Sequence, residues 1–127
     1  MKILTKFDTK MKVEIWVTYI LGTFDEATFV KQFDLPFVPQ EGMDITDSND
    51  DGEEVTVALR QGDWSSMMLQ YLTKDQLLVL DVKYFGNPRE LVNELKVNGV
   101  AQAYQTLGWK VQKPASFMKT PKKAGLE

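Results

Sequence analysis

Cysteine and histidine are both absent from this 127-residue chain, and their absence narrows the chemistry open to it. Without cysteine there is no disulfide and no thiol nucleophile, which is usual for a cytoplasmic protein. Without histidine there is no Ser-His-Asp or Cys-His site, no imidazole metal ligand and no imidazole general base. We therefore expect a protein that works by binding, since an enzyme would need carboxylates, lysine, tyrosine or a bound metal ion.

Long hydrophobic runs are missing as well. No apolar run approaches the roughly 20 residues that a membrane-spanning helix needs, and residues 1–6 lead into no apolar block of signal-peptide length. The sequence thus predicts neither a membrane span nor secretion, and we expect the protein in the cytoplasm. A chain of this length has room for one domain with its own hydrophobic core.

Charges of both signs are present, but they are segregated along the chain. Residues 1–12 carry a net charge of +3 and residues 109–127 a net charge of +4. The body between them, residues 13–108, holds six basic and sixteen acidic residues and therefore a net charge of −10. An acidic body repels nucleic acid, so we expect a basic protein as partner in preference to DNA or RNA.

Apolar residues alternate strictly over residues 11–21, which predicts a half-buried strand. Thr23 and Glu26 then have the spacing of a capping box, and apolar residues follow at helical spacing. Residues 24–34 are therefore predicted to form a short amphipathic helix. Alternation of apolar residues predicts further strands over residues 43–46, 53–60, 65–72 and 77–85. The last two of these strands are predicted to form a hairpin.

A second helix is predicted over residues 87–107. Asn87 stands at its cap, Pro88 at its first position and Glu90 three residues after the cap, as is typical of a helix start. The apolar stripe changes phase at Asn98-Gly99, which predicts a kink or two helical pieces. A hairpin that turns on this dipeptide is the alternative, because Asn-Gly favours type I′ turns.

The fold class that follows is α+β: a mainly antiparallel sheet of four to five strands with two helices packed on one face. The predicted element order is β-α-β-β-β-α, and residues 109–112 are a candidate for a final short strand. We predict a single domain over residues 1–112. Residues 113–127 contain two prolines and several lysines but few apolar anchors, so we expect a flexible basic tail there.

The acidic segment 44–54 is the one place where residue spacing matches known chemistry. It contains D-x-N-x-D-G, which resembles the start of an EF-hand calcium loop, where alternate oxygen side chains surround a hard cation. The resemblance fails downstream, because Ala58 stands where an EF-hand has its closing glutamate and a strand pattern follows. We interpret the segment first as a solvated or partner-facing turn, and second as a calcium site with the ligands Asp47, Asn49, Asp51 and Glu53.

The second face of the predicted sheet carries both apolar and ionisable side chains. Trp16 and Glu14 alternate with the core residues of the first strand, and Asp81 and Lys83 lie on the corresponding side of a later strand. An apolar sheet face implies another layer, supplied by residues 35–38 and the C-terminal segment or by a second copy of the chain. These four residues are therefore our candidate ligand or partner face.

The expected form of the protein is a homodimer that uses this second face. Lys83 is expected to form a cross-strand ion pair with Glu14 or Asp81. The less favoured alternative is a paired acid–base site at Glu14 and Asp81, in which the charge of one carboxylate raises the pKa of the other.

Residues 35–43, Leu-Pro-Phe-Val-Pro-Gln-Glu-Gly-Met, resemble a motif in small bacterial proteins of mobile elements, including integron gene cassettes and phage. The resemblance implies a small α+β protein of undefined activity, and it transfers no functional residues. An acidic protein in such a setting is compatible with an immunity or antitoxin role, in which a negative surface mimics nucleic acid or caps a basic toxin.

Together these features predict a non-enzymatic, self-associating acidic module that binds a basic protein. The alternative function is a small-ligand or calcium-binding domain that uses the loop over residues 47–53 or the face around Trp16. No cofactor other than calcium is predicted.

Overall fold

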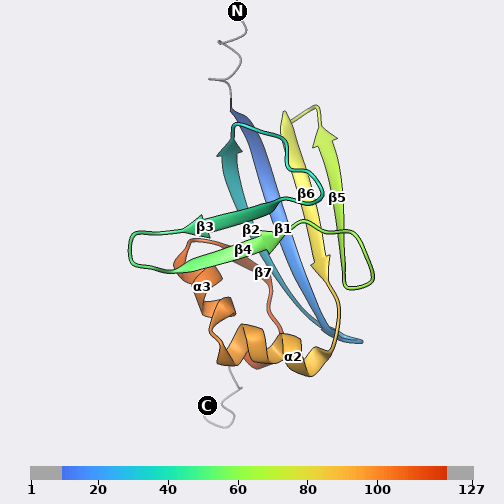
Figure 1. Ribbon diagram of the computed structural model, residues 1–127, viewed down its shortest axis with the longest axis vertical. Helices are drawn as coiled ribbons and strands as arrows, with labels where there is room; N and C mark the ends of the chain where they lie inside the picture. Colours follow the sequence, from blue (N-terminus) through green and yellow to red (C-terminus); the bar gives the residue numbers. More distant parts are fainter. Residues whose placement is uncertain (1–9, 120–127) are drawn as a thin grey trace, which may run out of the picture.

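The computed structural model describes residues 10–119 and has an α+β fold built on one five-stranded sheet (Figure 1). The strands lie in the order β5-β6-β1-β2-β7. β1 and β6 run parallel and the other neighbouring pairs run antiparallel. The predicted fold class is confirmed. The bounds of the sheet strands are Met11–Gly22 for β1, Asp25–Leu35 for β2, Ser65–Leu72 for β5, Leu77–Tyr84 for β6 and Lys110–Lys113 for β7.

A separate hairpin and the helical segment cover one face of this sheet (Figure 1). The hairpin consists of β3 (Asp44–Ser48) and β4 (Glu54–Ala58), which cross in front of β1 and β2. β1 directs alternate side chains toward this covering layer, and they are almost completely buried: Val13, Ile15, Val17, Tyr19 and Leu21. The alternation predicted for the first strand is therefore confirmed, and its apolar face forms the core.

The prediction of a helix over residues 24–34 is wrong, because these residues form β2. Thr23 and Phe24 make the turn of a hairpin, and β2 pairs with β1 along its whole length. Residues 27–30 are all buried, so β2 is covered on both faces at this point. Such a continuous run has no clear period, so it also matches helical spacing, and pairing with β1 overrides the local capping signal. The element order β-α-β-β-β-α is corrected accordingly.

The helix predicted over residues 87–107 is confirmed in broken form. α2 (Pro88–Val92) begins after Asn87, whose side chain accepts hydrogen bonds from the amides of Arg89 and Glu90. A π-helical turn, η1 (Asn93–Val97), leads to a break, after which Gly99 adopts φ of +80° and α3 (Val100–Thr106) begins. The hairpin alternative at Asn98-Gly99 is therefore wrong.

No helix within residues 10–119 is long and apolar enough to cross a membrane.

The domain extends beyond the predicted boundary at residue 112. The predicted final strand is present as β7, which continues to Lys113, and Ala115 after it is completely buried. A 3-10 turn, η2 (Ser116–Met118), follows, and Phe117 and Met118 pack against the core. The first part of the predicted tail therefore belongs to the domain, whereas residues 120–127 lie outside the described residues.

Three aromatic rings hold α3 against the sheet. Tyr104 is stacked on Phe29 of β2 with ring centroids 4.4 Å apart, and its hydroxyl lies 2.9 Å from the hydroxyl of Tyr19 in β1. Trp109 packs edge-on against Tyr104 at 5.0 Å. Since each hydroxyl of the tyrosine pair is buried, each depends on the other for its hydrogen bond.

The two hydroxyls of this pair are expected to be energetically coupled, so their separate losses should not add. Tyr104→Phe leaves the hydroxyl of Tyr19 buried without a partner, so the free energy of unfolding should fall by about 1–3 kcal/mol. Tyr19→Phe should behave similarly, and the double variant should lose clearly less than the sum of the two. Urea denaturation of the four proteins measures this coupling, and strictly additive losses would contradict it.

Candidate functional site

A hollow lies where the β5–β6 hairpin meets the first turn of α2, and two aromatic rings form its rim. Trp64 and Phe85 are 69% and 38% exposed, although both are large and apolar. The amide of Phe85 donates to the carbonyl of Trp64 at 2.8 Å, which places the two residues at the same end of the hairpin. Gly86 follows with φ of +136°, and a Cβ there would lie 3.8 Å from the Trp64 ring. The indole therefore lies against the turn that starts the helix.

Two cavities of about 380 and 360 Å³ make up the hollow, and they share Trp64, Phe85, Leu91 and Glu94. The first is lined also by Glu90 and the second by Tyr19 and Tyr84. Among the described residues, Glu90 and Glu94 are the only charged residues in either lining. The hollow thus combines aromatic walls with two carboxylates, and no basic side chain of the described residues lines it.

The helix start explains why the two glutamates lie together. The Asn87 cap and Pro88 begin the helix directly after β6, so its first turn lies over the end of the sheet. Glu90 and Glu94 are four residues apart and therefore on one side of the helical segment. Leu95, the next residue, is buried in the core and fixes the rotation of this turn.

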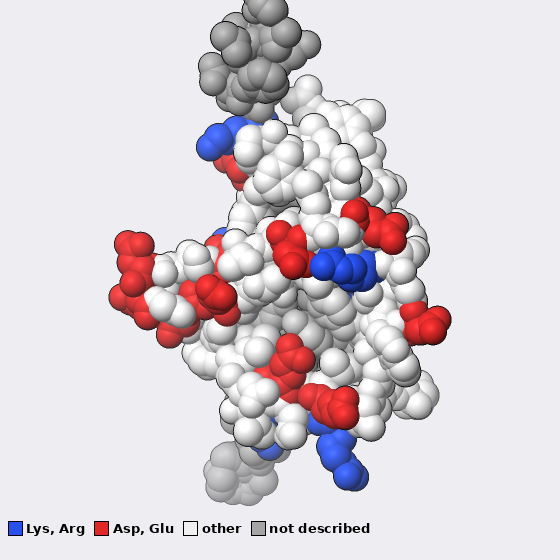
Figure 2. Space-filling model, in the orientation of Figure 1, with Lys and Arg blue, Asp and Glu red and all other residues white. Residues whose placement is uncertain are grey.

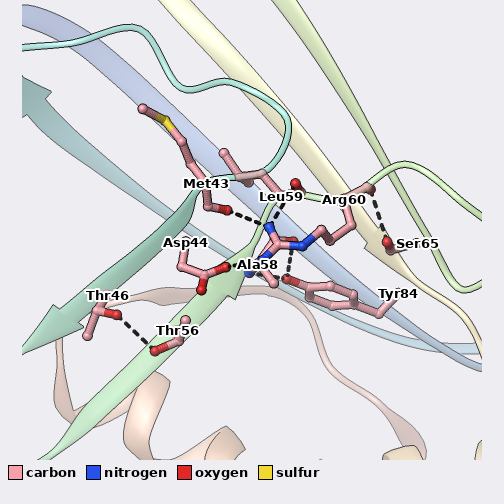
Figure 3. A network of polar contacts seen from close by, with 9 residues as sticks. All are labelled: Met43, Asp44, Thr46, Thr56, Ala58, Leu59, Arg60, Ser65 and Tyr84. Carbon is pink, nitrogen blue, oxygen red and sulfur yellow. Dashed lines mark hydrogen bonds and ion pairs between the residues drawn. The ribbon is translucent and has the colours of Figure 1, made fainter.

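Polar contacts connect the neighbouring hairpin to the rim of the hollow (Figure 3). The hydroxyl of Tyr84 donates to the carbonyl of Ala58 at 3.0 Å and accepts from its amide at 2.8 Å. Ser65, next to Trp64, donates from its hydroxyl to the carbonyl of Arg60 at 2.9 Å. The guanidinium of Arg60 in turn binds Asp44 at 2.9 Å. β4 and the start of β5 are thereby held in fixed positions beside the hollow.

The tyrosine hydroxyls at the base of the hollow are held in the neutral form. Burial raises the pKa of Tyr84 to about 12, although its hydrogen bond with Ala58 acts in the opposite direction. Burial, and then the charge of Tyr104, raise the pKa of Tyr19 well above its usual value. Neither hydroxyl is therefore available as a base near neutral pH.

The structure brings together the residues predicted for the second face. In the parallel pairing of β1 with β6, Trp16 lies opposite Asp81, Glu14 opposite Val79 and Thr18 opposite Lys83. The expected ion pair is absent, because none of the three ion pairs within residues 10–119 involves Lys83. Two described residues that were expected to help cover this face, Leu35 and Phe117, instead pack against the core on the opposite face.

The acidic loop is organised as a turn rather than as a ligand cage. Asp47 faces the sheet, where its Oδ2 accepts hydrogen bonds from Lys31 at 2.8 Å and from the indole of Trp109 at 2.9 Å. Asn49 instead caps the turn, since its Oδ1 accepts from the amides of Asp51 and Glu53 at 3.0 Å each. No group of three or more acidic side chains within residues 10–119 is placed to hold a metal ion. The predicted ligands are therefore not assembled, and calcium binding stays a prediction.

Comparison of the chain with protein-family models, with curated proteins and with solved structures found no match. The resemblance of residues 35–43 to proteins of mobile elements therefore stays a prediction. Function has to be inferred from the side chains themselves.

Sequence reasoning missed the hollow, although two signals for it were present. Trp64 is a large aromatic residue directly after the polar turn Gln61-Gly62-Asp63, which is an unusual place for a core residue. Glu90 and Glu94 have the spacing of neighbours on one helical side. Only the chain reversal at Gly86 places these carboxylates beside the indole, and no local pattern predicts that meeting.

Calcium is expected to leave the melting temperature unchanged, because Asp47 is already paired with Lys31 and Trp109. Asp47→Asn should lower the free energy of unfolding by about 1–3 kcal/mol through the loss of these charged hydrogen bonds. Asp51→Asn is the matched control and should have little effect. A thermal shift in millimolar calcium that Asp51→Asn abolishes would contradict this assignment.

Stability is expected to fall in alkaline solution. In the unfolded chain tyrosine ionises near pH 10, whereas Tyr84 in the folded chain does so near pH 12. The folded state therefore binds more protons in this interval, so stability that is complete below about pH 10 is lost as the pH rises toward 12. Urea denaturation across this range, with tyrosinate absorbance in parallel, measures the effect. Tyr84→Phe should reduce the slope, and an unchanged slope would contradict the assignment to this residue.

Proposed function

We propose that the protein binds a basic polypeptide, with a lysine or arginine side chain of the partner entering the hollow beside Trp64. The observation that supports this most directly is the lining: aromatic rings, two carboxylates and no basic group. A cation over an aromatic face gains about 0.5–2 kcal/mol, and the carboxylates add the opposite charge. The neutral state of Tyr19 and Tyr84 leaves Glu90 and Glu94 as the charges that a ligand meets.

The surface around the hollow favours the same class of partner. The β3–β4 hairpin, residues 44–58, carries six acidic residues and no basic one. Figure 2 shows carboxylates over the hairpin and beside the helical segment on this face, with few lysines or arginines between them. Such a field attracts a basic protein and speeds its association, while the hollow provides the specific contact.

The second sheet face differs from this acidic surface. Four of its residues are acidic, namely Glu14, Glu26, Asp34 and Asp81, and four are basic, namely Lys12, Lys83, Lys110 and Lys113. The two signs balance there, so the negative charge of the domain is concentrated on the side that carries the hairpin and the hollow. A role as an immunity protein or antitoxin against a basic protein would use this chemistry, and we propose it as the biological setting.

The proposal is tested by titration with short oligo-arginine and oligo-lysine peptides, with oligo-glutamate as the negative control. Binding should be seen by calorimetry and as a change in tryptophan fluorescence, since Trp64 is the tryptophan with a largely exposed ring. The Glu90→Gln, Glu94→Gln double variant should weaken binding by roughly tenfold, which is about 1.4 kcal/mol.

The matched control is Asp50→Asn with Asp51→Asn, which removes the same charge from the tip of the hairpin. This control should weaken binding much less at moderate salt, because exposed charges away from the hollow act only through the screened field. Equal losses in the two double variants would show that the hollow has no specific role. An absence of peptide binding at low salt would reject the function itself.

A further inference from the structure

We infer that two copies of this chain pair through the free edge of β5, which extends the five-stranded sheet across a twofold axis. β5 is an outer strand that pairs only with β6 among the described residues (Figure 1). The eight residues of β5, Ser-Ser-Met-Met-Leu-Gln-Tyr-Leu, include no charged residue, no proline and no glycine. Protein sheets usually protect an edge strand with charged residues or proline, because the unpaired backbone groups of an edge readily bind another strand. The inference does not depend on the proposed function.

The hydrogen bonds around β5 show which backbone groups face outward. The amide of Met67 donates to the side-chain Oε1 of Gln61 at 2.7 Å, so it points away from β6. The carbonyl of Trp64 accepts from Phe85, so even-numbered residues point toward β6. By the alternation of an antiparallel strand, the amides and carbonyls of Leu69 and Tyr71 also face outward. Gln61 occupies the start of the edge, and no strand within residues 10–119 pairs with the part around Gln70.

Side chains on both faces of this part of β5 are exposed although they are apolar. Met68 on the second face is 67% exposed, and Leu69 and Tyr71 on the core face are 38% and 51% exposed. Leu69 lies opposite Leu80 of β6, a fully buried residue, so no element of the described residues covers the core beyond β5. A strand placed beside β5 would shield these side chains on both faces at once.

A second copy fits this edge better than another partner does. In an antiparallel register that opposes Leu69 to Tyr71 of the second copy, the amides and carbonyls of both residues all find partners. The same register places the Leu69 side chain beside the tyrosine ring, a favourable cross-strand pair. Because β5 is uncharged, no like-charged side chains of the two strands oppose each other in this register. A closed twofold contact of this kind yields a dimer rather than a filament.

The test measures the molar mass of the full chain by sedimentation equilibrium over a wide concentration range. The unmodified protein should be dimeric at high concentration and dissociate on dilution. The Leu69→Lys, Tyr71→Lys double variant should stay monomeric while keeping its melting temperature close to that of the parent, since both side chains are already partly exposed. Val79→Lys, which adds a charge to the second face, is the matched control and should still form the dimer.

Amide hydrogen exchange gives a second readout that does not depend on variants. Within residues 10–119 the amides of Leu69 and Tyr71 face no acceptor, so they should exchange fast in dilute solution and slowly in the dimer. A protein that is monomeric at every concentration would overturn the inference. So would a dimer that Val79→Lys dissociates and Leu69→Lys, Tyr71→Lys does not, because the contact would then be the second face.

Discussion

The stacking of Tyr104 on Phe29 is the contact on which the rest of the molecule depends. It joins α3 to the sheet, and the hydrogen bond between the hydroxyls of Tyr19 and Tyr104 fixes the position of the Tyr104 ring. Together with the Asn87 cap and the buried Leu95, this contact positions the helical segment that carries the two glutamates of the hollow. Trp109 extends the same aromatic cluster toward β7, the outer strand that pairs with β2. A loss of this packing would therefore disturb the core, the sheet edge and the candidate site together.

The carboxylates near the turn of the β3–β4 hairpin have two different roles. Asp47 is partly buried and binds Lys31 and Trp109, so it attaches the hairpin to the sheet. Asp50 and Asp51 lie in the exposed turn and add to the negative field without a structural contact of comparable kind. The acidic segment is thus partly an anchor to the sheet and partly a turn exposed to solvent. A calcium ion bound at Asp47 Oδ2 would compete with Lys31 and Trp109, which already donate hydrogen bonds to this atom.

Much of the fold could be predicted wherever local pattern and tertiary environment agree. β1, the β5–β6 hairpin and the capped helix start at Asn87 were all visible as alternation or capping residues. β2 was mistaken for a helix because residues 27–30 are buried on both faces, which removes the period that separates strand from helix. The candidate site was predicted poorly, since Trp64 and Glu94 are thirty residues apart and meet only through two chain reversals.

The sequence by itself determined the periodic elements, the absence of imidazole and thiol chemistry, and the separation of acidic body from basic ends. These properties are local or compositional, so they can be read without knowing what lies nearby. Only the tertiary structure decided that β2 joins the sheet, that Asp47 binds Lys31, and that aromatic rings meet two carboxylates beside Gly86. Each of these depends on which distant segments become neighbours, and that choice comes from burying one apolar sheet face under the hairpin and helices.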